Sequence, residues 1–198
     1  MSEPVLRTPL GLRAVVFGRR PSAPAVRLEE APAAVRVGLR ASAEDAARIG
    51  VALGLDLPGP PLRAVTGELV VALRLGPEEW LLLAADPDPR PILAAIAGAA
   101  EGGHVAAVDL GHRFAEILVS GPAAPEVLAA GCPLDLDPRF APPGFASRTL
   151  LGKCEILLHR LGENRFRLLV NRSFAEYCWR FLEHAALEFG TPAPVTRS

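Results

Sequence analysis

The sequence predicts an α+β protein with two similar halves, and the order of its hydrophobic patterns is the main observation behind this prediction. Between residues 35 and 110, segments that alternate apolar and polar residues are interrupted twice by segments with helical spacing. The resulting order is strand, helix, two strands, helix, strand, which is the split βαβ arrangement of ferredoxin-like domains. A closely related succession begins again at residue 113. We therefore expect two ferredoxin-like halves packed together.

The expected boundaries divide the 198 residues into four segments. Residues 1–31 carry prolines and arginines with little periodicity, so we interpret them as an arm that becomes ordered only against another surface. The first α+β half covers residues 32–110 and the second covers residues 111–190. A short C-terminal tail, residues 191–198, follows.

Local signals define the elements of the first half. We expect strands at 35–41, 68–75, 79–84 and 104–110, with helices at 42–53 and after residue 88. Ser42 caps the first helix with Asp45 as the acidic member of a capping box, and Gly54 ends it. Asp88 followed by Pro89 starts the second helix.

The second half repeats these signals. We expect strands at 113–120, 147–152, 153–161 and 165–170, and helices at 121–130 and 173–189. Ser173 and Glu176 predict a capping box at the start of the last helix. Apolar residues with helical spacing predict the buried side of this helix: Phe174, Tyr177, Cys178, Phe181, Leu182, Ala185 and Phe189.

Composition argues against several function classes. The chain has 21 basic and 22 acidic residues and a formal net charge of -1, so it lacks the basic surface of a nucleic-acid-binding protein. It has no apolar run of about 18 residues and no signal-peptide pattern, so we expect a cytoplasmic protein outside the membrane. Half of the residues are hydrophobic and the mean hydropathy is +0.27. We expect a partner to cover part of this apolar surface.

The three cysteines are odd in number and widely spaced, which favours reduced thiols over a disulfide framework. Cys178 falls within the apolar spacing of the last helix, and we interpret it as buried. Cys154 and His159 differ by five positions on one predicted strand, so their side chains should point to opposite faces. This spacing argues against a metal site shared by the two residues.

The segment GCPLDLDP, residues 131–138, could hold a nucleophile or end a helix. We expect Gly131 in the left-handed conformation after the helix, with Pro133 preventing its continuation. The negative end of the helix dipole disfavours a thiolate at Cys132. We therefore interpret the segment as a helix terminator, and Asp135 and Asp137 as turn residues rather than metal ligands.

Asp109 and His112 lie in DLGHR, at the junction of the two halves, and allow two interpretations. A buried Asp109 could hold an amine or a pterin ring through charge-assisted hydrogen bonds. It could equally tie down the local backbone. The sequence has no phosphate-binding glycine loop, no nucleophile elbow and no zinc-ligand spacing. The residues therefore predict no catalytic, cofactor-binding or metal-binding site.

Three segments resemble the gamma subunit of heterotetrameric sarcosine oxidase: LRLGPEEWLLLA (73–84), VDLGHRFAEILVSGPAAPEVLAAGCPLDLDP (108–138) and LLVNRSFAEYCWRFLEHA (168–185). The resemblance covers about residues 33 to 189, and its middle segment is the most specific. It implies a fold similar to the folate-binding fold of the glycine-cleavage T-protein. It also implies an accessory subunit with a structural or assembly role and no active site of its own.

The resemblance further implies an oxidoreductase complex of sarcosine catabolism and one-carbon metabolism. Such complexes oxidatively demethylate sarcosine to glycine, and they yield hydrogen peroxide with formaldehyde or methylenetetrahydrofolate. FAD, FMN, NAD and tetrahydrofolate are expected on the alpha and beta partner subunits, and zinc on the delta subunit. Whether the substrate is sarcosine or a related methylated amine would depend on another subunit.

Two departures from the family pattern argue against carrying a ligand role to the junction of the halves. Leu110 and Gly111 follow Asp109, where the family often has a small polar residue, and GFASRT (144–149) lacks a cysteine of this region. A stand-alone folate-binding aminomethyltransferase-like protein, with Asp109 as its ligand-side acid, is the alternative function. A cysteine hydrolase that uses Cys132 is a third.

Overall fold

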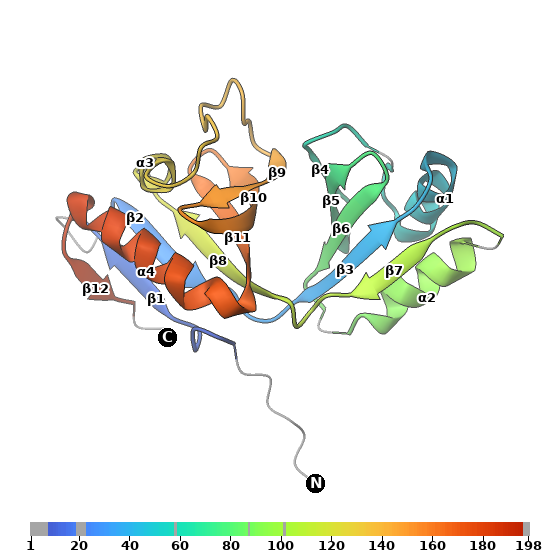
Figure 1. Ribbon diagram of the computed structural model, residues 1–198, viewed down its shortest axis with the longest axis horizontal. Coiled ribbons are helices and arrows are strands. Elements are labelled where there is room, and N and C mark those ends of the chain that lie inside the picture. Colours follow the sequence, from blue (N-terminus) through green and yellow to red (C-terminus); the bar gives the residue numbers. More distant parts are fainter. Residues whose placement is uncertain (1–7, 19–22, 58, 87, 101, 196–198) are drawn as a thin grey trace, which may run out of the picture. The chain divides into compact units, whose positions relative to one another are not determined.

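The computed structural model describes residues 8–18, 23–57, 59–86, 88–100 and 102–195. The chain divides into two compact units (Figure 1). Unit 1 comprises Met1–Ala33, Phe114–Pro143 and Arg148–Ser198, and unit 2 comprises Ala34–Arg113 and Gly144–Ser147. Within the described residues, no helix is long and apolar enough to cross a membrane.

Unit 2 has the predicted ferredoxin-like order. Its elements are β3 (Val35–Arg40), α1 (Ala43–Leu53), β4 (Ala64–Thr66), β5 (Val70–Gly76), β6 (Glu79–Ala84), α2 (Arg90–Ala99) and β7 (Ala106–Asp109). The strands form an antiparallel sheet in the order β4-β5-β6-β3-β7. Apart from the short β4, which the sequence patterns did not predict, this is the strand order of a split βαβ domain.

The ends of α1 follow the predicted capping signals. The Ser42 hydroxyl accepts a hydrogen bond from the Asp45 N–H at 3.1 Å, and Gly54 ends the helix in the left-handed region with φ 65°. The start of α2 differs slightly from the prediction, because Pro89 occupies the N-cap position. Asp88 still binds the start of the helix, since its carboxylate accepts a hydrogen bond from the N–H of Arg90, the first residue of α2, at 3.0 Å.

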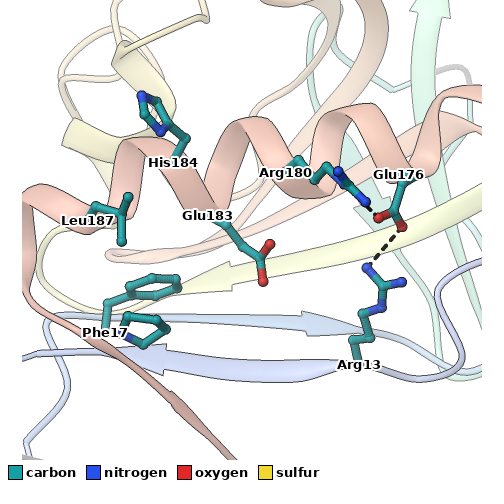
Figure 2. A pocket seen from close by; sticks show the side chains of 8 residues that line it. Arg13, Phe17, Glu176, Arg180, Glu183, His184 and Leu187 are labelled. Carbon is teal, nitrogen blue, oxygen red and sulfur yellow. Dashed lines mark hydrogen bonds and ion pairs between the residues drawn. The ribbon is translucent and has the colours of Figure 1, made fainter.

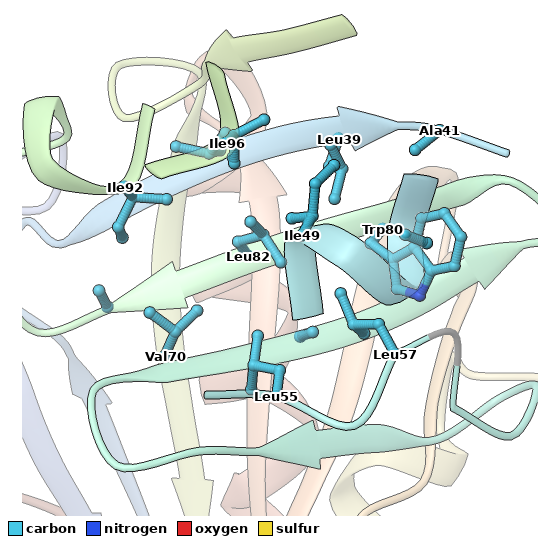
Figure 3. Close-up of a cluster of buried hydrophobic side chains, with 14 of the residues drawn as sticks. Leu39, Ala41, Ile49, Leu55, Leu57, Val70, Trp80, Leu82, Ile92 and Ile96 are labelled. Atoms are coloured by element: carbon cyan, nitrogen blue, oxygen red, sulfur yellow. The ribbon is translucent and has the colours of Figure 1, made fainter. Parts of the chain in front are cut away.

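The core of unit 2 is formed by one face of the sheet and by both helices (Figure 3). Leu39 and Trp80 come from neighbouring strands, and each is 1% exposed. Ile49 of α1 and Ile96 of α2 belong to the same buried cluster. Full burial of one such side chain is worth about 1.5–3 kcal/mol, so this cluster is a major source of the unit's stability.

Unit 1 contains a larger sheet. Its elements are β1 (Ala14–Phe17), β2 (Val26–Glu30), β8 (Phe114–Ser120), α3 (Ala124–Ala129), β9 (Ala146–Leu151), β10 (Cys154–Gly162), β11 (Arg165–Asn171), α4 (Ala175–Ala186) and β12 (Pro192–Pro194). The first two residues of β9 belong to unit 2. The strand order is β12-β1-β2-β8-β11-β10-β9. The neighbours β8, β11 and β10 repeat the arrangement of β3, β6 and β5 in unit 2.

The N-terminal segment differs from the expected arm. Strands β1 and β2 form a hairpin, and β2 pairs with β8, with Leu28 opposite Val119. Phe17 and Leu28 are almost fully buried, so burial of apolar side chains in unit 1 holds the hairpin in place. Residues 1–7 and 19–22 of the expected arm lie outside the described residues.

The expected C-terminal tail also contributes to the sheet of unit 1. Strand β12 pairs with β1, with Ala193 opposite Val16. Residues 196–198 of the tail lie outside the described residues. Together, β1, β2 and β12 extend the sheet beyond β8, on the side away from β11.

The start and the buried side of the last helix also differ from the prediction. A 3-10 turn, Arg172–Phe174, precedes α4, and no side chain caps the helix. Phe174 and Tyr177 are 50% and 41% exposed. Cys178 and Leu182 are buried as predicted, and the buried side is completed by Ala175, Trp179 and Ala186. Apolar residues cover a wider arc of this helix than the core occupies, so the spacing alone did not fix which part is buried.

Candidate functional site

A groove of about 510 Å³ beside α4 is the candidate binding site of unit 1 (Figure 2). Half of its side chains come from α4 and Leu187 directly follows that helix, while Arg13 precedes β1, Phe17 ends β1 and Pro192 begins β12. Phe17 is 1% exposed, so the groove has a rigid apolar part. The lining residues are Arg13, Phe17, Glu176, Arg180, Glu183, His184, Leu187 and Pro192.

Three charged side chains of the groove pair with one another. Glu176 accepts a hydrogen bond from the Arg180 Nε at 2.9 Å and forms an ion pair with Arg13, also at 2.9 Å. The hydrogen bond from Arg180, followed by that from Arg13, lowers the pKa of the Glu176 carboxyl. All three side chains are more than 40% exposed, so each pair contributes little to stability. The groove presents a fixed polar surface that suits contacts with polar groups of a partner.

Sequence analysis did not identify this groove. The spacing of Glu176 and Arg180 by four residues on a helix was a visible signal for an ion pair. Arg13 carried no such signal, because it is the folded sheet of unit 1 that brings the N-terminal segment to α4.

The segment after α3 is a helix terminator, as predicted, but Gly131 acts differently from the prediction. The Cys132 N–H donates to the Leu128 carbonyl at 2.8 Å and closes the helix end. Gly131 does not have a positive φ, so the left-handed conformation expected there is wrong. A Cβ at Gly131 would lie 2.6 Å from Cε1 of Phe181 and 2.9 Å from the Gly152 nitrogen. Glycine is therefore required here by close approach rather than by backbone conformation.

Asp135 and Asp137 form side-chain turns, which confirms their predicted role as turn residues. The Asp135 carboxylate accepts a hydrogen bond from the Asp137 N–H at 2.9 Å. The Asp137 carboxylate accepts hydrogen bonds from the Arg139 N–H and from its Nε, both at 2.9 Å. The side-chain hydrogen bond from Arg139 is the main cause that lowers the pKa of Asp137 to about 2. Across the described residues, no group of three or more His, Cys, Asp or Glu could hold a metal ion.

A buried arginine holds this segment against β10. Arg160 is 1% exposed, and its guanidinium donates to the carbonyls of Leu136 at 2.7 Å and Ala141 at 2.6 Å. It also donates to the carbonyls of Gly162 and Glu163. These acceptors are main-chain groups, which carry no sequence pattern, so sequence analysis could not single out Arg160.

The three cysteines are buried free thiols. Cys154 of β10 and Cys178 of α4 lie close enough to interact, a proximity that their sequence positions did not indicate. Burial, followed by the neighbouring Cys154, raises the pKa of the Cys178 thiol to about 12. Cys132 is also buried, with its sulfur 3.8 Å from the Thr149 hydroxyl. Burial leaves little of the Cys132 thiol accessible to a substrate, which argues against a nucleophilic role.

His159 and Cys154 have separate neighbours in the sheet, in keeping with their odd spacing. His159 lies opposite Arg167 of β11. Burial, followed by the charge of Arg167, lowers the pKa of His159 to about 4. Arg167 in turn donates from its Nε to the Glu116 carboxylate at 2.7 Å.

The Asp109 side chain forms a hydrogen bond with the neighbouring main chain. Its carboxylate is exposed and accepts a hydrogen bond from the Gly111 N–H at 2.8 Å. His112 is also exposed. The pterin hypothesis requires a buried acid with free oxygens, so Asp109 does not fit it.

A family model described as "Sarcosine oxidase, gamma subunit family" matches residues 38–188. The chain belongs to this family. The chain is 34% identical over 196 residues to a sarcosine oxidase subunit gamma from Arthrobacter sp, covering 96% of this chain and 95% of the relative. It is 36% identical over 171 residues to a sarcosine oxidase subunit gamma from Corynebacterium sp. (strain U-96), covering 83% of this chain and 81% of the relative.

Solved structures agree with membership in the gamma subunit family. A chain of heterotetrameric sarcosine oxidase from Corynebacterium sp. U-96, in complex with pyrrole 2-carboxylate, matches with a TM-score of 0.83 and 31% identity. The match covers 98% of this chain and 100% of that chain. The glycine cleavage system aminomethyltransferase T from Bartonella henselae matches with a TM-score of 0.58 and 14% identity, covering 77% of this chain and 44% of that chain. The second match concerns the fold alone, and it confirms the predicted likeness to the T-protein.

Proposed function

We propose that this chain is the accessory gamma subunit of a heterotetrameric sarcosine oxidase. The match to a chain of the Corynebacterium enzyme, at a TM-score of 0.83 over 98% of this chain and 100% of that one, is the observation that carries the proposal. A likeness that extends over both whole chains supports an equivalent place in a comparable complex. The complex would oxidatively demethylate sarcosine, or a related methylated amine, to the corresponding amine. The methyl carbon would leave as formaldehyde or methylenetetrahydrofolate, and oxygen would be reduced to hydrogen peroxide.

The proposed role of this chain is assembly rather than chemistry. Its polar candidates have structural partners: the aspartates of residues 131–138 form turns, and Arg160 binds main-chain carbonyls. In the proposal, the alpha and beta subunits carry FAD, FMN, NAD and tetrahydrofolate, and the delta subunit carries zinc. The complex would lie in the cytoplasm and would bind neither nucleic acid nor membrane.

The aminomethyltransferase alternative is not favoured by a specific observation. It depends on Asp109 as a ligand-side acid, and the Asp109 carboxylate is exposed and engaged with the Gly111 N–H. The cysteine hydrolase hypothesis is not favoured either, because Cys132 is 5% exposed and its thiol is hardly accessible to a substrate. Loss of activity in Cys132→Ala would be required to revive that hypothesis.

An omission experiment tests the proposed function. The alpha, beta and delta subunits of the source organism are expressed with and without this chain, and sarcosine-dependent release of hydrogen peroxide is measured with the yield of soluble complex. We expect this chain to copurify with the other subunits, to raise the yield of assembled complex, and to release no peroxide by itself. Equal yield and activity in its absence, with no copurification, would show that the proposal is wrong.

A further inference from the structure

The edges of the two sheets differ in how well they are protected. An exposed edge strand presents unpaired N–H and C=O groups, and proteins normally block it with proline, charge or a covering segment. Strand β12 of unit 1 carries Pro192 and Pro194, which have no N–H to offer. Strand β9 carries Arg148, and just beyond its end the Gly152 N–H donates to the Gly131 carbonyl at 2.9 Å.

A covering segment protects the β4 edge of unit 2. The Ala64 N–H donates to the Gly144 carbonyl at 2.7 Å, and the Ala146 N–H donates to the Leu62 carbonyl at 3.0 Å. Arg63 and Phe145 form a bridge between these two hydrogen bonds. Residues 144–146 therefore occupy the outer side of this edge.

Within the described residues, the β7 edge of unit 2 has neither a proline nor a covering segment, and its one charge is that of Asp109, its last residue. Its sequence, Ala-Ala-Val-Asp, contains no proline, lysine or arginine, and β3 is its one ladder partner in the part of the chain that the structure describes. Ala106, Val108 and Asp109 are exposed, Val108 to 55%. An edge strand whose first three residues are apolar and carry no proline, charge or covering segment is available to pair with another chain.

The hydrogen bonds of β7 identify the groups that remain for a partner. The Leu110 N–H donates to the Arg36 carbonyl at 2.6 Å, on the β3 side. Because main-chain groups of an antiparallel strand alternate between its two sides, Ala107 and Asp109 direct their N–H and C=O groups to the outer side. These outward groups favour an extended segment as partner, because its own N–H and C=O groups are free to pair, whereas those of a helix are paired internally.

We propose that β7 is a docking site at which an extended segment of one of the larger subunits adds as a further strand. This inference rests on the proposed function, and a complex of four different chains favours another subunit over a second copy of this chain. Asp109 is the charged side chain of β7, so the incoming segment should carry a lysine or arginine near it and apolar residues near Val108. Main-chain hydrogen bonds would supply affinity and these side chains specificity.

Val108→Lys tests the proposal, with Val51→Lys as its matched control. Val51 lies on α1 of the same unit and is 85% exposed, so both variants place a lysine at an exposed valine. The measurement is the dissociation constant of the full chain for the immobilised complex of the other three subunits, together with the thermal midpoint of each variant. We expect Val108→Lys to weaken binding by about tenfold or more, because a charged edge residue opposes strand addition. Val51→Lys should bind like the wild type, and both variants should keep its thermal midpoint.

Asp109→Asn is a second variant that keeps the side-chain oxygen for the Gly111 N–H and removes the charge. We expect it to weaken binding by about threefold and to reduce the dependence of binding on salt. If the wild type binds the other subunits and both β7 variants bind equally well, the docking proposal is wrong while the proposed function stands. A dimer of the isolated chain that Val108→Lys dissociates would overturn the choice of a larger subunit. If the wild type does not bind the other subunits, both the proposed function and this inference fail.

Discussion

His159 should make the stability of the protein depend on pH. The side chain is 5% exposed, and its Nδ1 has no hydrogen-bond partner among the residues that the structure describes. Burial, followed by the charge of Arg167, lowers the pKa of His159 from 6.5 to about 4 in the folded chain. The unfolded chain therefore binds a proton at a higher pH than the folded chain does. The resulting stability is fully present above pH 6.5 and is lost as the pH falls toward 4. A difference of about 2.5 pKa units corresponds to about 3 kcal/mol in total, and to about 2 kcal/mol between pH 7 and pH 5.

Urea unfolding of the wild type and of His159→Gln at pH 7 and pH 5 measures this effect. The wild type should lose about 2 kcal/mol more than the variant between these two pH values, because glutamine has no proton to bind. His184→Gln removes an exposed histidine of the same unit and controls for the loss of an imidazole. Equal losses in wild type and His159→Gln, or an NMR titration that gives His159 a pKa near 6.5, would refute the reasoning.

Three further predictions concern packing, the buried arginine and the thiols. Gly131→Ala should cost about 1–3 kcal/mol of unfolding free energy by overpacking against Phe181, whereas Gly98→Ala, in an open position of α2, should stabilise by about 0.5–1 kcal/mol. Arg160→Met should cost about 3–5 kcal/mol of unfolding free energy, because it leaves buried carbonyls unpaired. Its exposed control, Arg139→Met, should cost less than about 1 kcal/mol. Urea unfolding measures the two glycine variants and the two arginine variants, and equal effects within either pair would contradict the prediction for that pair. None of the three buried thiols should react with a thiol reagent in the folded chain, and all should react in urea; stoichiometric labelling of the folded chain would show that a thiol is accessible.

Local signals predicted unit 2 well. Strand β6 covers Glu79–Ala84, as predicted, and α1 has the predicted caps at Ser42 and Gly54. The hairpin of β1 and β2 was missed because its strands are short and gain their burial from β8, with Leu28 opposite Val119. Sequence spacing cannot report a pairing between segments so far apart along the chain.

The candidate site shows the same division between local and distant effects. The helix terminator at 131–138 was predicted because glycine, proline and aspartate act on their own neighbourhood. The groove includes the ion pair between Arg13 and Glu176, which come from distant parts of the chain. The helix terminator is held by hydrogen bonds from Arg160 to its main-chain carbonyls. Both require the folded sheet of unit 1, so neither could be predicted from residue spacing.

Native mass spectrometry of material purified through a tag on this chain tests the central claim most directly. We predict an assembly that contains one copy of the 20.9 kDa chain and one copy of each of three different partner chains. Recovery of this chain alone, or only with copies of itself, while the other subunits assemble without it, would contradict its assignment as a gamma subunit.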